Sequence, residues 1–358
     1  MRIVSLNVNG LRAFDSKNGN DFNTFCSNIL QGDIICLQET KGCPTSLSKY
    51  HSLKDYLTLS SYFKKGIYGV STLIKKNLFC SKSEEIVPGR ILKTHHGPFV
   101  VFNCYMPYCD ETLEKDKTEI IKVYNILQEA IENTQKKNVQ IVICGDMNAT
   151  YNVLDHYLYF NELCTLIEQN KWKKHDDISK SKRLVQYSRG FSVDRDKIGP
   201  KMREKYKIYH ELIKTEEEFQ DDTLFNSKVE KINPKATEVP FHFFTFEALK
   251  NYFFEVYQRR WMNNLVENFV DTFRIHNKQV EQYTCWNVLF NLRPINWGSR
   301  IDYVLCSKDV ECSDSGIMPE IMGSDHCPVF AILNLEEIKD DEKNIVKRKN
   351  NLFDYFSK

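Results

Sequence analysis

Short apolar runs rich in β-branched residues recur along the whole chain, and turn residues or polar residues bound each of them. They occupy residues 2–6, 34–37, 70–74, 99–104, 139–144, 300–305 and 328–333. Runs this short and this apolar are typical of β-strands that are buried on at least one face. Helical patterns separate some of them, most clearly from Lys117 to Lys136, where apolar side chains recur at helical spacing. Strands interleaved with helices over this length predict an α/β (α+β) fold in which helices cover the sheets.

Residues 171–240 differ in composition from the rest of the chain. This stretch is rich in Lys, Asp and Glu and poor in apolar runs, with one helical pattern at residues 203–219. We therefore expect a charged surface insertion rather than a second domain. Residues 1–335 would then form one domain, and residues 336–358 would form a charged tail that ends in an apolar cluster.

Charge and cysteine usage narrow the class of protein. The formal net charge is +1, so binding to nucleic acid would require a local basic face. The lysines of the 171–240 insertion could supply that face, although an ordinary solvated loop has the same composition. The 12 cysteines lie mostly inside apolar runs without a CxxC pair, which argues against a zinc ribbon and favours reduced thiols of an intracellular protein. We see no secretory signal and no apolar run long enough to cross a membrane, so we expect no membrane partner.

Polar residues follow the apolar runs at several points, where an α/β scaffold presents functional groups from its loops. Together with one acid inside a strand, they are Asn7, Glu39, Tyr105, Asp146, Asn148, Asp302, Asp325 and His326. Carboxylates and amides with little thiolate favour a hard cation, magnesium or manganese, over zinc. A hard metal with a histidine and a phenol suits hydrolysis of a phosphodiester, because the metal stabilises charge on phosphate oxygens while a base activates water.

Each of these residues also has an ordinary structural explanation. An Asp after a strand commonly caps a turn, and an Asp325-His326 pair is commonly a solvated surface pair. Tyr105, which stands close to Pro107, could be a core aromatic. The ordered occurrence of all these segments on one chain favours a single site over several coincidences.

The segments resemble the exonuclease III family of AP endonucleases, within the endonuclease/exonuclease/phosphatase superfamily. The matching stretches are residues 6–10, 37–41, 105–107, 145–148, 300–303 and 324–328, and they occur in family order. The resemblance implies a four-layer α/β sandwich, with two packed mixed β-sheets flanked by helices, as the catalytic domain at 1–335. Residues 283–287 and 293–305 further resemble the branch of the second (type-2) eukaryotic AP endonuclease.

The resemblance implies a magnesium-dependent DNA repair hydrolase of the nucleus. Its activity would be that of a DNA-(apurinic or apyrimidinic site) endonuclease with 3′-phosphodiesterase and 3′–5′ exonuclease action, in base excision repair. Its substrate would be double-stranded DNA with abasic sites or blocked 3′ ends. We expect a monomer with Mg²⁺, or alternatively Mn²⁺, as cofactor.

The same resemblance assigns roles to the site residues. Glu39 would be the main metal ligand, with the metal site completed by Asn7, Asp146, Asn148, Asp325 and His326. His326 would contact the scissile phosphate, and Asp302 would orient its ring. Asp146 would activate water or protonate the leaving oxygen, Asn148 would steady the transition state, and Tyr105 would contact the phosphate.

The tail carries a pattern of its own. Its Leu352, Tyr355 and Phe356 follow a basic run with the spacing of a peptide that binds the sliding clamp (PCNA). A helical turn would place these three side chains together, so that they could enter one apolar pocket. The usual first residue of that pattern is Gln, and here it is Lys349. The basic run could also serve nuclear import.

Two other functions compete with DNA repair. A superfamily phosphatase acting on an inositol phosphate or a lipid head group would use similar acids, but it leaves the 283–305 run and the tail unexplained. A non-catalytic scaffold that binds DNA or the clamp predicts that metal or histidine positions have been lost. All of the acids and the histidine named above are present.

Overall fold

The computed structural model describes residues 1–64, 66–108, 114–156, 257–278, 282–288, 292–296 and 298–336. These residues divide into two compact units. The first unit contains the described residues of Met1–Ala149, Trp261–Val280 and Ile301–Lys358, and the second contains those of Thr150–Arg260 and Glu281–Arg300. The predicted insertion at 171–240 and the tail residues Leu352, Tyr355 and Phe356 lie outside the described residues.

One six-stranded sheet of the first unit, sheet 1, has the order β13-β14-β1-β2-β4-β3. The first two strands of the chain pair in parallel, and the other neighbours in this sheet are antiparallel. Its strands are β1 (Arg2–Asn7), β2 (Ile34–Gln38), β3 (Tyr56–Ser61), β4 (Val70–Lys75), β13 (Glu311–Ile317) and β14 (Val329–Asn334).

The second six-stranded sheet, sheet 2, has the order β5-β6-β7-β8-β12-β9. Here β7 and β8 are parallel and the other neighbours are antiparallel. Its strands are β5 (Lys82–Val87), β6 (Ile91–His95), β7 (Phe99–Tyr105), β8 (Gln140–Asp146), β9 (Phe269–Asp271) and β12 (Asp302–Ser307). Both sheets are therefore mixed.

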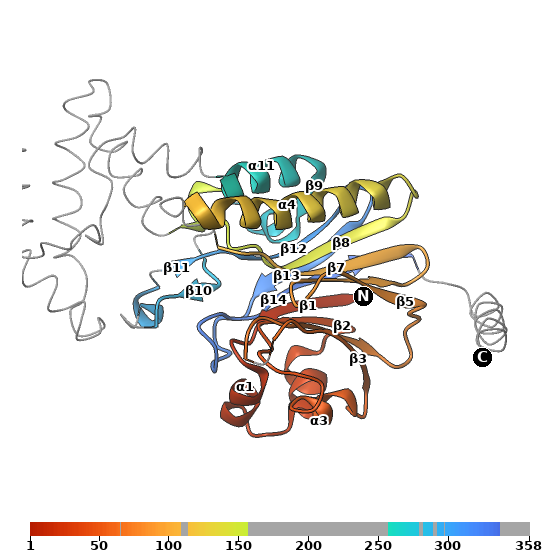
Figure 1. Cartoon of the computed structure of the whole chain (residues 1–358), viewed down its shortest axis with the longest axis vertical. Coiled ribbons are helices and arrows are strands. Elements are labelled where there is room, and N and C mark those ends of the chain that lie inside the picture. Colours follow the sequence, from red (N-terminus) through yellow and green to blue (C-terminus); the bar gives the residue numbers. More distant parts are fainter. Residues whose placement is uncertain are drawn as a thin grey trace, which may run out of the picture. The chain divides into compact units, whose positions relative to one another are not determined.

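The two sheets pack face to face, and helices cover their outer faces (Figure 1). One core contains side chains from both sheets, such as Ile34 and Ile74 from sheet 1 and Val142 and Val304 from sheet 2. A second core joins the outer face of sheet 1 to α1 (Leu11–Lys17), α2 (Phe22–Thr24), η1 (Phe25–Leu30) and α3 (Ser48–His51). On the outer side of sheet 2 lie α4 (Glu114–Gln135) and α11 (Tyr257–Asn268). Tyr124 of α4 is buried, and its ring centroid is 5.0 Å from that of Trp261 in α11. This arrangement confirms the predicted four-layer α/β sandwich.

The helices among the described residues of the first unit are short except for two. They are α1 (Leu11–Lys17), α2 (Phe22–Thr24), the π-helical η1 (Phe25–Leu30), α3 (Ser48–His51), α4 (Glu114–Gln135), α11 (Tyr257–Asn268, whose first residues belong to the second unit) and α12 (Thr272–His276). The predicted helix at 117–136 corresponds to α4, with Leu127 and Ile131 buried as its spacing indicated. No helix of the described residues is long and apolar enough to cross a membrane.

The described part of the second unit contains η2 (Val153–Asp155), β10 (Cys285–Trp286), η5 (Arg293–Ile295) and β11 (Gly298–Ser299). Asp155 and Arg300 form a buried bidentate ion pair, with nitrogen–oxygen distances of 2.8 and 3.0 Å. Removing one partner of such a pair typically costs about 3–5 kcal/mol, because the other charge stays buried.

Gly145 allows β7 and β8 to pair closely just before both strands end. It lies opposite Cys104, and its φ of 137° is one that side-chain-bearing residues rarely adopt. A Cβ at this position would lie 1.8 Å from the Cys104 carbonyl oxygen. Tyr105 and Asp146, the next pair in the register, are thereby placed side by side.

Candidate functional site

The strand ends of the two sheets bring the candidate site together within the first unit. Asn7 ends β1 and pairs in register with Gln38, which ends β2. Asp146 ends β8 opposite Tyr105 on one side and Asp302, the first residue of β12, on the other. Because β14 is antiparallel to β1, the loop that precedes it, with Asp325 and His326, lies at the same end of sheet 1 as Asn7.

The chain turns sharply just after β2 and just after β8. Glu39 has a φ of 51° and Asn148 a φ of 48°, in the left-handed region that Asn tolerates better than Glu. Hydrogen bonds hold the first turn on one flank, where the amides of Thr40 and Lys41 donate to the carbonyls of Gly69 and Tyr68 at 3.0 and 2.8 Å. Backbone strain of this kind persists only where the surroundings fix it, and it clusters at functional sites.

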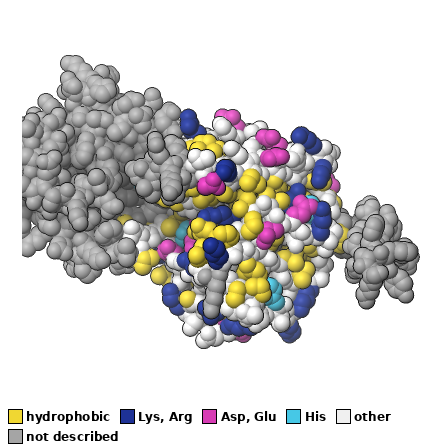
Figure 2. Space-filling view, in the orientation of Figure 1, with side chains coloured by type: hydrophobic (Ala, Val, Ile, Leu, Met, Phe, Trp, Pro, Cys, Tyr) yellow, Lys and Arg dark blue, Asp and Glu magenta, His cyan; other side chains and the backbone are white. Residues whose placement is uncertain are grey.

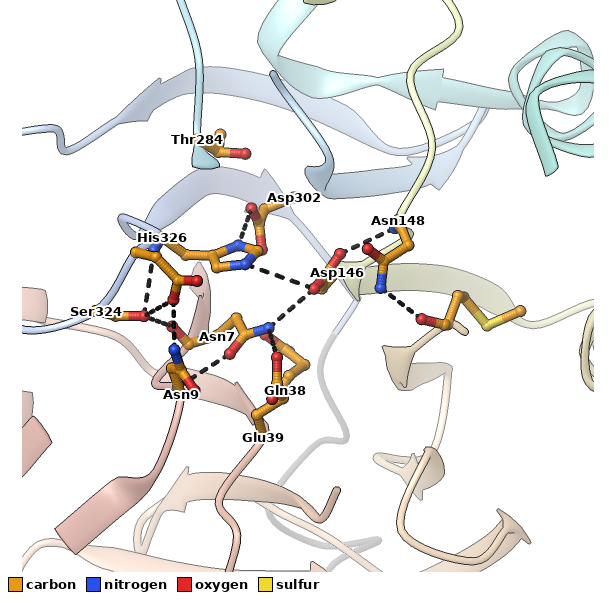
Figure 3. A network of polar contacts seen from close by, with 12 residues as sticks. Asn7, Asn9, Gln38, Glu39, Asp146, Asn148, Thr284, Asp302, Ser324 and His326 are labelled. Atoms are coloured by element: carbon orange, nitrogen blue, oxygen red, sulfur yellow. Dashed lines mark hydrogen bonds and ion pairs between the residues drawn. The ribbon is translucent and has the colours of Figure 1, made fainter. Parts of the chain in front are cut away.

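An amide joins two of the predicted acids at the centre of the site (Figure 3). Asn7 donates from its Nδ2 to Glu39 Oε1 at 2.8 Å and to Asp146 Oδ2 at 2.9 Å. The second oxygen of Asp146 accepts from the backbone amide of Asn148 at 2.9 Å, and the Asn148 side chain donates to the Met106 carbonyl at 2.7 Å. Each oxygen of the Asp146 carboxylate is therefore oriented by a separate donor.

A histidine–carboxylate pair lies beside this cluster. His326 Nδ1 is 2.8 Å from Asp302 Oδ2, and the other ring nitrogen, Nε2, is 3.8 Å from Asp146 Oδ2. Both His326 and Asp302 are buried. A carboxylate on Nδ1 fixes the tautomer and raises the basicity of the ring, which leaves Nε2 as the nitrogen that faces the cluster.

The arrangement fits a divalent cation. Ligand atoms of Glu39, Asp146 and His326 all lie within 4.8 Å of one another. Burial raises the pKa of Asp146 to about 7, and the neighbouring Asp302 carboxylate adds to this rise although His326 opposes it. Ligand atoms of two carboxylates and an imidazole can thus converge on one point. A hard cation there would offset the unfavourable burial of the Asp146 charge.

Asp325 lies at the rim of the cluster, where residues not predicted from the sequence surround it. Its Oδ1 accepts from Asn9 Nδ2 at 2.9 Å, and Ser324 Oγ, 3.2 Å away, also donates to the Asn7 carbonyl at 2.8 Å. Lys41 contacts Asn9 Oδ1 and forms an ion pair of 2.8 Å with Glu39 Oε2. Asn9 and Lys41 belong to the same segments as Asn7 and Glu39, which was the one signal in the sequence that could have identified them.

Tyr105 is partly exposed at the site rather than buried in the core. Burial and the nearby carboxylates of Glu39 and Asp146 raise the pKa of its phenol well above the usual range. Its hydroxyl therefore stays protonated and can donate. Arg90 also contacts Tyr105: it donates to the Tyr105 carbonyl at 3.1 Å, and its guanidinium is 5.1 Å from the ring centre. No pattern in the sequence indicated Arg90, which lies 15 residues away along the chain.

The structure thus brings all eight site residues predicted within residues 1–335 to one end of the two sheets. Their roles as ligands or catalysts stay predictions, since geometry alone does not show them. The predicted partner-binding residues of the tail lie outside the described residues.

Comparisons with known proteins agree with this geometry. Residues 4–161 and 241–326 match the model of the Endonuclease/Exonuclease/phosphatase family. Over 94% of its length the chain is 22% identical to the human protein named DNA-(apurinic or apyrimidinic site) endonuclease 2, and it spans 61% of that protein. It is 24% identical to a Bacillus subtilis exodeoxyribonuclease, covering 94% of this chain and all of that protein.

Among solved structures, the fold resembles the Xenopus laevis APE2 catalytic domain, with a TM-score of 0.60 and 22% sequence identity. The likeness covers 95% of this chain and 94% of that one. At this identity it shows a shared fold. Because the family model matches more than half of its residues, the chain belongs to the Endonuclease/Exonuclease/phosphatase family.

Proposed function

We propose that the protein is a Mg²⁺-dependent DNA repair phosphodiesterase that incises DNA at abasic sites and trims blocked 3′ ends. The observation that carries the proposal is the buried Asp302–His326 pair, in which the second ring nitrogen, Nε2, faces Asp146 beside Glu39. Such a set suits hydrolysis of a phosphodiester. The names of the relatives support DNA as the substrate, and one of them is called an exodeoxyribonuclease.

The residues of the chain divide the proposed chemistry between them. Glu39 and Asp146, aided by Asn7, Asn148 and Asp325, would hold Mg²⁺ or Mn²⁺, which when bound would stabilise negative charge on the phosphate oxygens. His326 would contact the scissile phosphate through Nε2, while Asp302 keeps a proton on Nδ1.

Proton transfer would fall to Asp146 and Tyr105. Since the pKa of Asp146 is raised to about 7, its carboxylate can take a proton from water or return one to the leaving oxygen near neutral pH. The protonated phenol of Tyr105 would donate to a phosphate oxygen. Asn148 would hold Asp146 in the orientation that this transfer needs.

The first test is cleavage of two labelled duplexes with Mg²⁺, one with an internal abasic site and one with a nick that carries a blocked 3′ end. Wild-type protein should cut at least one of them. Glu39→Ala should lower the rate by about 100-fold or more, because it removes the main carboxylate of the cation site. The ratio of the two wild-type rates measures the balance between incision and end trimming.

Glu119→Ala is the matched control, because its side chain is 74% exposed on α4 and its ion pair is a surface one. This variant should cut as wild type does. A folded wild-type protein that cuts neither duplex with Mg²⁺ or Mn²⁺ would exclude the repair function and favour an inositol phosphate or lipid head group phosphatase, or a scaffold.

Asp302→Asn tests the orientation of His326. Asparagine has a similar shape but cannot stabilise a protonated ring, and its amide can select the wrong tautomer. We expect kcat to fall about 100-fold or more with little change in KM. The pH profile of kcat should also change, because the basicity of His326 depends on this carboxylate. An unchanged pH profile would show that Asp302 acts only in folding.

The raised pKa of Asp146 predicts that cation binding depends on pH. Below about pH 7 the carboxyl of the metal-free protein is protonated, so a cation must displace a proton to bind. The affinity for Mn²⁺ should therefore rise about tenfold per pH unit up to about pH 7 and then level off. Titration calorimetry from acidic to neutral pH measures this, and Asp146→Asn should flatten the dependence. The same slope in the variant would assign the proton to another group.

We further propose that the tail binds the sliding clamp through Leu352, Tyr355 and Phe356, on the support of their spacing in the sequence. Calorimetry with the purified clamp should detect binding of the full chain and no binding of a Tyr355→Ala, Phe356→Ala double variant. Asn351→Ala, between the motif positions, should bind as wild type does. Equal binding of all three would exclude the motif.

A further inference from the structure

Three aromatic rings lead from the site to the surface of the first unit. The ring centres of Tyr105 and Tyr68 are 5.9 Å apart, and those of Tyr68 and Phe63 are 5.7 Å apart. Tyr105 is partly exposed beside Asp146, whereas Phe63 is 51% exposed. We name Phe63, Tyr68 and Tyr105 the ring row; it runs outward from the cluster of acids.

Two cations lie against the same rings. The Arg90 guanidinium is 3.8 Å from the Tyr68 ring centre, and the Lys64 ammonium is 5.3 Å from that of Phe63. Aromatic faces that alternate with cations are the features that bind single-stranded nucleic acid, since bases stack on the rings and phosphates pair with the cations. Apolar and basic side chains also lie side by side elsewhere on the visible face (Figure 2).

The backbone that carries the outer rings is held in place. The Gly69 amide donates to the Gly89 carbonyl at 2.9 Å, and the Ile67 amide donates to the Lys64 carbonyl at 3.0 Å. A Cβ on Gly89 would lie 2.8 Å from the Cβ of Phe63, so these two segments pack closely. A fixed ring loses little conformational freedom when a base stacks on it.

The turn of Tyr68 also connects the ring row to the site. Tyr68 has a φ of 57° and its carbonyl accepts from the Lys41 amide, two residues after Glu39. A nucleic acid strand on the ring row would therefore be continuous with one whose phosphodiester lies at Glu39 and Asp146.

We propose that the ring row binds an unpaired segment of the DNA strand that is being cut, with a base on Phe63 and phosphates near Lys64 and Arg90. Paired bases inside a duplex have no free face to offer, so an exposed ring selects bases that are frayed or single-stranded. This inference rests on the proposed function and adds to it a preference for unpaired strand next to the scissile phosphate.

The test measures binding without metal, so that no cleavage occurs. Fluorescence anisotropy would compare a labelled single strand of about 16 nucleotides with a blunt duplex of the same length. Phe63→Ala should weaken binding of the single strand about tenfold. Its binding of the duplex should change less than about twofold. Phe63→Trp should restore binding of the single strand, because indole also stacks.

Two further variants separate stacking from other effects. Leu57→Ala removes another exposed apolar side chain, 44% exposed on β3, and should bind both probes as wild type does. Lys64→Ala should lower the slope of log affinity against log salt concentration by about one, the value expected for the loss of one phosphate contact. Stacking on an aromatic ring quenches the fluorescence of 2-aminopurine. A 2-aminopurine base in the single strand should therefore lose fluorescence on binding to wild type or Phe63→Trp, and lose less on binding to Phe63→Ala.

Unchanged binding of the single strand by Phe63→Ala, or an equal loss with the duplex, would overturn the inference. Either result leaves the cleavage of abasic duplex by wild type as a separate question. Conversely, wild-type protein that binds the single strand through Phe63 but cuts neither duplex would refute the proposed function alone.

Discussion

The hydrogen bond from Gln38 Nε2 to Asn103 Oδ1, 2.9 Å long, joins the two sheets directly below the site. Both side chains are fully buried. Asn103 also donates to the Ser71 carbonyl at 3.0 Å, and Gln38 to Ser5 Oγ at 3.1 Å, so four strands share one polar network. A buried polar group left without a partner costs about 1–3 kcal/mol, and this penalty opposes any sliding of one sheet over the other. The positions of the acids at the strand ends depend on that fixed registration.

The site itself opposes folding. It gathers the carboxylates of Glu39, Asp146 and Asp302 around one buried histidine, and it holds Glu39 in left-handed backbone. Each of these features costs free energy that the packed sheets must offset. The raised pKa of Asp146 measures the unfavourable burial of its charge. A bound cation would relieve it, so the energy of the site favours cation binding.

The interior of the fold could be predicted from the sequence because buried strands such as β2 and β8 consist of continuous apolar runs. The edge strands β5 and β13 could not, since they are mostly polar and only partly buried and owe their conformation to pairing with a neighbour. The same division holds at the site. Asp146 and Glu39 follow apolar runs and were predictable, whereas the position of Arg90 depends on the pairing of β6 with β7. These two strands form a hairpin whose register brings Arg90 to Tyr105, 15 residues further along the chain, and the residues around Arg90 do not encode that register.

The close pairing of β7 and β8 restricts which residue can occupy position 145. The residue bears no reactive group, yet the Cys104 carbonyl fills the space that any side chain would need. A larger residue would force β8 away from β7 at the Cys104–Gly145 pair. Tyr105 and Asp146, the next pair in the register, would then move apart. A backbone oxygen atom therefore excludes every residue with a side chain from this position. A mutational scan would register the position as essential, although the cause is the spacing of two strands.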